Sequence, residues 1–235
     1  MDSTKQIFGF IRLLRPQFLL AYLIVGIGGI TIGLTQDQKL TTSSFGILGF
    51  LPVILAAIGV HLRDEASDWV NGYDTEFGGM GVIREDVYSV KTVQILGFLF
   101  TIIGIILGVL QALFLPSLWL IGLPMLVVIV FVNYLTEEIS LGHEGVTASS
   151  YWGTFLWAYL AQDWPITLSI ALFSIFVYLL VFALIPYQDV GDYDVDRKNG
   201  KKTLTARLGV DGIGQLSIFI ALSSLLVLYS ALLVA

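Results

Sequence analysis

The chain has 235 residues, of which 56% are hydrophobic and only 13% are charged, and its mean hydropathy is +0.86. A soluble domain carries about 25% charged residues, so this composition excludes a soluble, a nucleic-acid-binding and a disordered protein. The absence of cysteine excludes disulfides, thiolate metal sites and cysteine nucleophiles. We therefore expect an all-α, polytopic membrane helix bundle that forms a single domain over residues 1–235.

Seven apolar segments are predicted to span the membrane, namely 17–34, 45–62, 92–115, 118–135, 147–161, 166–187 and 212–235. A spanning helix needs roughly 20 mostly apolar residues, and most of these segments approach that length. The fifth segment is the shortest and contains Ser149, Ser150, Tyr151 and Trp152. Its polarity indicates either a tilted span or a helix that faces a cavity.

The basic residues set the orientation of these spans. With the N-terminus in the cytoplasm, 11 of the 12 Lys and Arg residues lie on the inner side, and only Lys39 lies outside. Most of the acidic residues fall on the same side, concentrated in the loops 63–91 and 188–211. We therefore expect an integral protein of the cell membrane with its active site on the cytoplasmic face.

Each of the two acidic loops contains a D-x-x-x-D pattern just after a span. The first pair is Asp64 and Asp68, and the second is Asp192 and Asp196. If the spanning helix continues, residues i and i+4 share one face, where two carboxylates repel each other unless a cation lies between them. Magnesium takes one or two protein carboxylates and completes its shell with phosphate and water. Two facing pairs therefore predict two Mg²⁺ ions that bind a diphosphate.

Basic side chains on the same side of the membrane would neutralise further phosphate charge. The predicted diphosphate-binding residues are Arg15, Arg63, Arg84, Arg197, Lys201 and Lys202.

The residues around these carboxylates resemble the UbiA superfamily of intramembrane prenyltransferases. The family's first motif, N-D-x-x-D-x-x-x-G-x-D, reads D-E-x-x-D-x-x-x-G-x-D over 64–74. The F-G-G-S-G-V-I stretch of the menaquinone-type 1,4-dihydroxy-2-naphthoate polyprenyltransferase branch reads F-G-G-M-G-V-I over 77–83. The second motif, N-D-x-x-D-x-x-x-D-R-x-x-G-K-x-T-L, reads Q-D-x-x-D-x-x-x-D-R-x-x-G-K-x-T-L over 188–204. Arg15-Pro16 also resembles the family's N-terminal Arg-Pro, and the likeness covers the whole chain, although the family usually has nine spans.

The resemblance implies transfer of a polyprenyl group from its diphosphate to a lipophilic acceptor in the membrane. An aromatic quinone precursor is favoured as the acceptor, followed by an archaeal-type glyceryl-phosphate lipid, then a carotenoid end group or a porphyrin. The implied catalytic metal ligands are Asp64, Asp68, Asp192 and Asp196, supported by Asp74, Asp189 and Gln188. The implied wall of the prenyl and acceptor pocket is Trp69, Tyr73, Tyr134, Tyr151, Trp152 and Tyr187.

Two other functions stay open. Glu138 occupies a position where the family often has Lys, so an intramembrane terpene cyclase, which ionises the same diphosphate without an acceptor, is an alternative. A divalent-cation transporter is the second, but it would place its acids near the bilayer midplane. His61, at the end of the second span, is interpreted as an interfacial residue, and His143 as a candidate base for an acceptor.

Overall fold

The computed structural model describes residues 3–35, 46–73, 79–132 and 142–235, and the regular structure in these ranges is entirely helical. The first half contains α1 (Ser3–Leu13), α2 (Pro16–Thr35), the short η1 (Gly46–Phe50), α3 (Leu51–Val70) and α4 (Val90–Ala112). The second half contains η2 (Leu118–Gly122), α5 (Leu123–Val132), α6 (Gly142–Leu160), α7 (Leu168–Leu184), η3 (Ile185–Val190), α8 (Tyr193–Lys198) and α9 (Leu204–Leu233).

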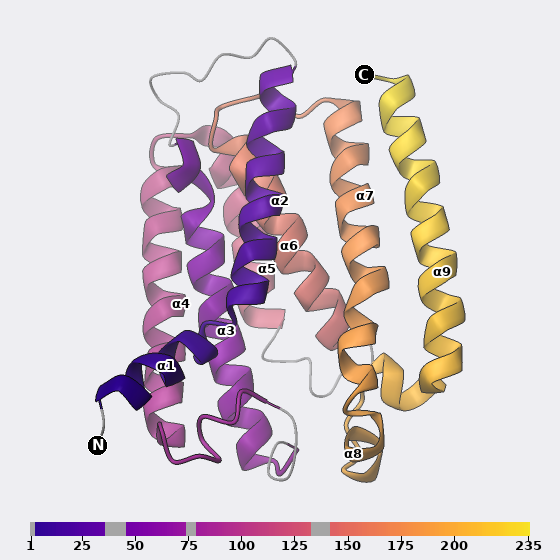
Figure 1. The fold of residues 1–235 in the computed structure, drawn as a ribbon. Helices are drawn as coiled ribbons and strands as arrows, with labels where there is room; N and C mark the ends of the chain where they lie inside the picture. The colour runs from indigo at the N-terminus through magenta and orange to yellow at the C-terminus, as the bar shows by residue number, and fades with distance from the viewer. Residues whose placement is uncertain (1–2, 36–45, 74–78, 133–141) are drawn as a thin grey trace.

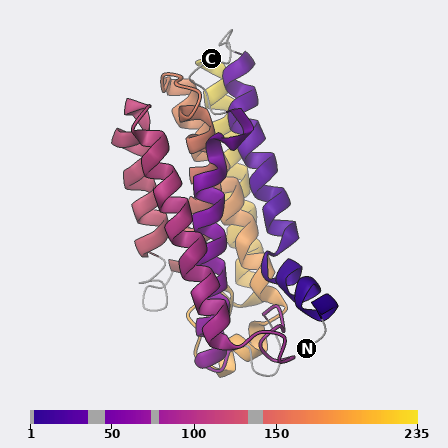
Figure 2. The same ribbon diagram turned by 90° about the vertical axis from the view of Figure 1, so that its left-hand side faces the viewer.

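Within the described residues, each of the seven predicted spans overlaps one long helix or helix pair of this bundle, while positions 45 and 133–135 lie outside them. The long helices run side by side, and α1, the connection from α3 to α4, and α8 all lie at one end (Figure 1). The C-terminus lies at the opposite end, as the second view also shows (Figure 2). The chain is therefore the all-α membrane bundle that its composition predicts, with both acidic loops on one side.

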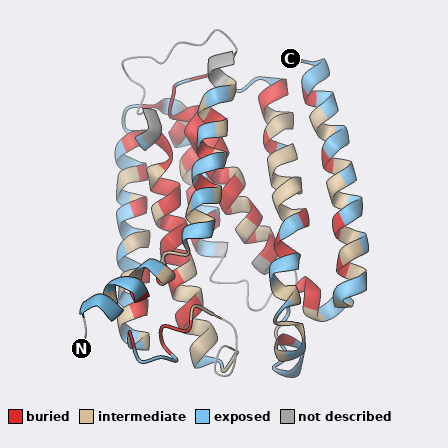
Figure 3. Ribbon diagram, in the orientation of Figure 1, coloured by how far each residue is buried: buried red, intermediate tan, exposed pale blue. Residues whose placement is uncertain are grey.

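Hydropathy alone identifies only some of these helices as spans. Among the described residues, α4, α9 and the combined segment Leu168–Val190 are long and apolar enough to cross a membrane. A fourth span results if Ser3–Leu13 and Pro16–Ile32, which meet at 45°, are one bent helix. Both α3 and α6 are more polar, yet buried residues are concentrated on them while α4 and α9 expose many side chains (Figure 3). Because protein surrounds α3 and α6, their polar groups do not face lipid.

Small residues hold α3 and α4 together along their length. A Cβ atom at Gly59 would lie 2.5 Å from the backbone nitrogen of Thr101, and one at Gly104 would lie 2.6 Å from that of Ala56. Backbones approach this closely only where side chains are absent, as is common between membrane helices. The pair therefore forms a rigid support for the carboxylates at the end of α3.

The centre of the bundle satisfies its polar groups internally. The indole N–H of the buried Trp157 on α6 donates to Oε1 of Gln111 on α4 at 2.8 Å. The amide of Gln111 donates in turn to the carbonyl of Leu48 in η1 at 3.2 Å. This chain of hydrogen bonds joins three elements, so burial of the two side chains does not leave these donors unpaired.

Candidate functional site at the acidic end of the bundle

The first carboxylate pair lies on a direct continuation of a spanning helix, as its spacing requires. The predicted span ends at 62, but α3 extends to Val70 and carries Asp64 and Asp68 on consecutive turns. The helix then stops at Asn71 and Gly72, whose φ is +83°. We conclude that α3 projects its carboxylates beyond the apolar part of the bundle.

The second pair is arranged differently from a continuous helix. After α7 the chain tightens into η3, which begins at Ile185-Pro186 and contains Gln188 and Asp189. Asp192 then precedes the separate short helix α8, which carries Asp196. The amide of Asp196 still bonds the carbonyl of Asp192 at 2.8 Å, so the two carboxylates remain one turn apart. A proline ring obstructs the preceding helical turn, which explains why α7 does not continue straight into the motif.

Both motifs end in the same backbone structure. In each, the helix ends D-x-x-N-G: Asp68 is followed by Asn71-Gly72, and Asp196 by Asn199-Gly200. Both glycines have positive φ, and the amide after each glycine bonds the carbonyl of the motif aspartate at 2.9 Å. This is a Schellman cap, which requires glycine at the left-handed position.

The two caps face each other. The side-chain amide of Asn199 lies 3.5 Å from the carbonyl oxygen of Gly72. The residues that follow the two glycines also meet, because the Lys201 ammonium lies 5.4 Å from the ring centroid of Tyr73. The sequence predicts each loop separately, and this contact shows that they form one site.

Lys201 joins the carboxylates of the two motifs. Its Nζ donates to Oδ2 of Asp68 at 2.9 Å and lies 4.0 Å from Oδ1 of Asp196. The exposed fractions of the three side chains are 23%, 13% and 6%. Burial by itself would lower the pKa of Lys201, but the carboxylates of Asp68, Asp196 and Asp64 outweigh it and raise the pKa above its usual range. A permanent cation therefore lies between the two D-x-x-x-D pairs.

Arg15, which is also a predicted diphosphate-binding residue, forms a second ion pair with a carboxylate of the protein. Its guanidinium donates to Oε2 of Glu65 at 3.0 Å, and Oε1 of Glu65 accepts the amide of Met80 at 2.7 Å. Arg15 has a φ of +48° at the break between α1 and α2, where Pro16 begins α2. Glu65 was not among the predicted site residues, although a charge inside the first motif was a signal for it. Glu65 therefore joins both the glycine-rich loop at Met80 and the break between α1 and α2 to α3.

The other predicted phosphate ligands lie at the same end of the bundle. Arg84, Arg197 and Lys202 are exposed, and Arg197 bonds the Tyr193 hydroxyl at 2.7 Å. Arg63 is half-buried on α3, next to Asp64. All four lie at the acidic end, so they are available around a ligand bound there.

The predicted aromatic wall is divided between several places. Tyr73 lies under Lys201, and Tyr151 is buried with its ring stacked on Tyr22 at 4.2 Å between centroids. Trp152 packs edge-on against Tyr178 at 6.5 Å, whereas Trp69 is only half-buried and Tyr187 is exposed.

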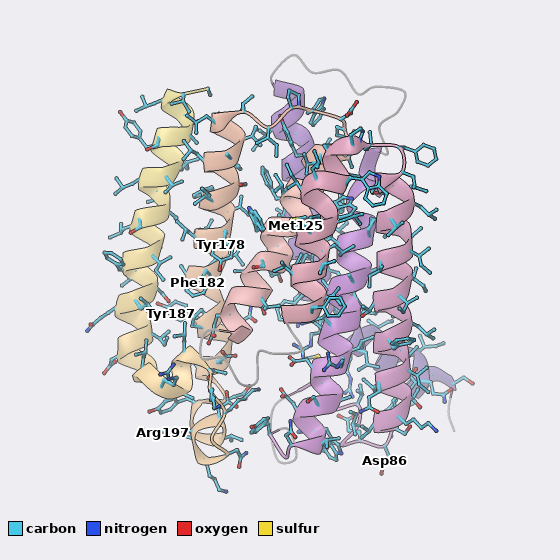
Figure 4. The ribbon with its side chains drawn as sticks, turned by 180° about the vertical axis from the view of Figure 1, so that it is seen from behind. Asp86, Met125, Tyr178, Phe182, Tyr187 and Arg197 are labelled. Carbon is cyan, nitrogen blue, oxygen red and sulfur yellow. The ribbon has the colours of Figure 1, made fainter. Side chains whose placement is uncertain are left out.

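Figure 4 shows Tyr178, Phe182 and Tyr187 following one another along α7 and η3 toward the end that carries Arg197. Tyr134 and Asp74, also predicted for the site, lie outside the described residues, as does the side chain of His143. The predicted aromatic residues therefore do not form one continuous wall among the described residues.

A buried carboxylate of α6 contacts the end of the second motif. Glu144, in the first turn of α6, is fully buried and accepts the amide of Leu204 at 2.5 Å. The hydroxyl of Thr203 accepts the amide of Ala206 and begins α9. The G-K-x-T-L tail therefore ends in a helix N-terminus that a carboxylate from another helix stabilises.

The donor set fits a magnesium ion shared with a ligand. No group of three or more His, Asp or Glu side chains converges on one point among the residues that the structure describes. However, Asp68 and Asp196 come close enough to share one cation, as Lys201 shows. Magnesium needs only one or two protein carboxylates when phosphate and water complete its shell.

Comparison with known proteins identifies the fold. No protein-family model matches the chain, and neither does any curated protein. Two solved structures do, both of UbiA homologs from Archaeoglobus fulgidus. The one bound to GPP and Mg²⁺ has a TM-score of 0.75 at 14% identity, over 97% of this chain and 78% of the homolog. The one bound to DMAPP and Mg²⁺ has a TM-score of 0.66 at 14% identity, over 95% and 84%.

These observations define the class of fold. The molecule is an all-α membrane bundle that brings two carboxylate motifs together at one end around a lysine. Its fold is that of the UbiA homologs, which confirms at the level of the fold the resemblance that the motifs indicate.

Proposed function

We propose that the protein transfers a polyprenyl group from a polyprenyl diphosphate to a lipophilic acceptor in a magnesium-dependent reaction. The observation that carries this proposal is the convergence of Asp68, Asp196 and Lys201 from two distant loops. Both anionic and cationic groups are needed to hold a metal diphosphate, and both are present at this point. The structural neighbours bound to GPP or DMAPP with Mg²⁺ support the same substrate class.

The acidic end would hold two Mg²⁺ ions through carboxylate and amide oxygens. The proposed ligands are Asp64, Asp68, Asp192 and Asp196, supported by Asp74, Asp189 and Gln188. When bound there, magnesium supplies positive charge that stabilises the diphosphate as it leaves. Arg15, Arg63 and Lys201, with the exposed Arg84, Arg197 and Lys202, would neutralise the remaining charge.

The substrate's two ends determine how it would lie. The diphosphate belongs at the charged end of the bundle, and its hydrocarbon tail belongs among the apolar spans. The allylic carbon between them would then lie just inside the carboxylates, on the side of Tyr151. Rings at such a position stabilise an allylic cation through their π faces.

We further propose that residues 1–235 act as one domain in the cell membrane with the site on the cytoplasmic face. The excess of Lys and Arg at the acidic end supports this orientation. Among acceptors, an aromatic quinone precursor is favoured, because the F-G-G-M-G-V-I stretch resembles the menaquinone-type branch.

The test is magnesium-dependent release of pyrophosphate from geranylgeranyl diphosphate by the detergent-purified protein. Variants Asp68→Asn and Asp196→Asn should each abolish release, whereas the matched control Asp211→Asn, an exposed acid of α9 at the same end, should retain it. Dependence of release on 4-hydroxybenzoate or 1,4-dihydroxynaphthalene would identify a transferase, and release without any acceptor, together with a cyclised hydrocarbon product, would identify the cyclase. A folded protein that releases no pyrophosphate with either probe would overturn the proposal and bring the transporter forward.

A further inference from the structure

His61 lies on the same face of α3 as the first carboxylate pair. Seven residues separate His61 from Asp68, which places the two side chains almost in line along the helix. The rise of an α-helix puts His61 about 10 Å deeper into the bundle than Asp68. His61 is half-buried, while Leu62 beside it is fully buried. The histidine thus occupies the level just inside the charged end.

Two aromatic side chains of α2 hold the imidazole ring in place. The Tyr22 hydroxyl and Nε2 of His61 lie 3.3 Å apart, and the Phe18 ring stacks on the imidazole at 5.6 Å between centroids. Tyr22 itself stacks on Tyr151 of α6. A hydrogen bond at one ring nitrogen sets both the orientation and the tautomer of a histidine. An interfacial histidine would not need such a setting, so the structure points to a more specific role.

The ionisable groups near this ring come from each element packed against it. Tyr22 belongs to α2 and Tyr151 to α6, and the Arg15 guanidinium lies 5.6 Å from the centroid of the Phe18 ring. On α3 itself, Asp64 and Glu65 are one turn away, and Glu65 is paired with Arg15. Arg63 is two residues away on the same helix, and the charge of the Arg15 guanidinium is offset by its ion pair with Glu65.

The reaction proposed above releases a proton at this level. The bond between the allylic carbon and the diphosphate oxygen breaks, and the electron pair leaves with the diphosphate. The allylic carbon then bonds to a ring carbon of the acceptor, which must lose its hydrogen as a proton. In the cyclase alternative, the cyclised cation loses a proton in the same way. Either product therefore needs a base beside the allylic carbon.

We propose that Nδ1 of the His61 imidazole takes this proton, while Nε2–H donates to the Tyr22 hydroxyl and so orients the ring. This inference rests on the proposed function, because it assigns a base to that same reaction. His61 is placed where the tail and the diphosphate of the substrate meet, and its aromatic neighbours limit the access of water. The leaving diphosphate is the competing base, and it lies on the other side of the allylic carbon.

The experiment measures the released pyrophosphate and, in parallel, how the prenyl group is divided between the possible products. Geranylgeranyl diphosphate is supplied with Mg²⁺ and with 4-hydroxybenzoate or 1,4-dihydroxynaphthalene, both of which have a free ring position beside a hydroxyl. Deprotonated product, meaning prenylated acceptor or terpene hydrocarbon, is compared with prenyl alcohol formed by water. His61→Gln can still bond Tyr22 but has no basic nitrogen. It should release pyrophosphate at near the wild-type rate and form deprotonated product about 100-fold more slowly.

Two further variants separate a base from a structural residue. Tyr22→Phe keeps the ring and loses only the hydroxyl, so it should reduce deprotonated product about 10-fold, less than His61→Gln does. Imidazole added to His61→Ala should restore deprotonated product, which a purely structural role would not allow. Thermal unfolding of each variant in detergent shows that it is folded.

The outcomes distinguish this inference from the proposed function. Wild-type protein that releases no pyrophosphate would overturn both. Release by the wild type together with an unchanged ratio of products in His61→Gln would overturn only the role of His61 and assign the proton to the diphosphate. Loss of release and product together in a folded His61→Gln, with no rescue by imidazole, would also overturn it.

Discussion

Replacing Lys201 by methionine should destabilise the protein and make its stability more dependent on magnesium. The variant leaves the carboxylates of Asp68 and Asp196, 13% and 6% exposed, without the ammonium that they share. Removing one partner of a fully buried ion pair costs roughly 3–5 kcal/mol. Because the Lys201 side chain keeps 23% exposure, the expected loss in the free energy of unfolding is smaller, about 2–3 kcal/mol.

Magnesium should restore this loss, because it can take the place of the missing charge. A ligand that binds only the folded state at 100 times its Kd stabilises that state by about 2.7 kcal/mol. In the wild type Lys201 competes for the same oxygens, so the gain should be smaller there.

The assay is thermal unfolding in detergent, with EDTA and then with increasing Mg²⁺. For a chain of this size, the expected deficit without metal is about 5–10 °C. The control is Lys202→Met, which removes the same charge from an exposed neighbour and should behave as the wild type does. Equal melting temperatures for the two variants without metal, or equal shifts with magnesium, would refute the reasoning.

Three other predictions concern the supporting structure. Glu144→Ala should lower the free energy of unfolding by about 2–3 kcal/mol, because the N-terminus of α9 loses a charged acceptor. Glu144→Gln should lower it by less than half of that amount, and thermal unfolding measures both losses. Gly59→Ala should lower the free energy of unfolding by about 1–3 kcal/mol, because the neighbouring backbone cannot move away. Gly28 has open space around it, so Gly28→Ala should be neutral or stabilising. A Gly59 variant as stable as the Gly28 variant would contradict the close packing of α3 on α4. The hydrogen bond from Arg12 lowers the pKa of Glu85 from 4.5. The stability that this ion pair gives to α1 should therefore be present above pH 4.5, and it should be lost as the pH falls through the lowered pKa. The mobility of a spin label on α1 should rise over that range, and it should be high at every pH in Glu85→Gln.

The sequence predicts the arrangement of helices and the location of the site because both depend on local patterns. Apolar length identifies the spans, and the distribution of Lys and Arg identifies the end where the loops gather. The extension of α3 to Val70 follows from the spacing of Asp64 and Asp68. The break before α8 is also local, and Ile185-Pro186 was the available signal for it.

Contacts between distant residues could not be predicted in this way. Arg15 and Lys201 were both expected to bind phosphate, which is reasonable for basic residues on the same side of the membrane. The structure pairs Arg15 with Glu65 and Lys201 with Asp68, 50 and 133 positions away. Periodicity shows which face of a helix a residue occupies, but not which loop meets that face. The same holds for the two Schellman caps. The D-x-x-N-G pattern of each cap can be read from the sequence, but the contact between the two caps cannot.

The fifth predicted span shows why polarity in a membrane helix is ambiguous evidence. Its serines indicated a tilted helix or a cavity, yet α6 is largely buried and packs against the other helices of the bundle. The hydroxyls of Ser149, Ser150 and Thr154 each donate to the carbonyl four residues earlier on α6 itself. Such bonds satisfy a hydroxyl without water or a partner helix, so the side chain is then as small and as easily packed as an apolar one. A hydropathy scale counts these residues as if they faced solvent, and it therefore ranks the most enclosed helix of the bundle among the weakest spans. A hydrogen bond that leaves this helix also ends on protein, because the Trp157 indole donates to Gln111.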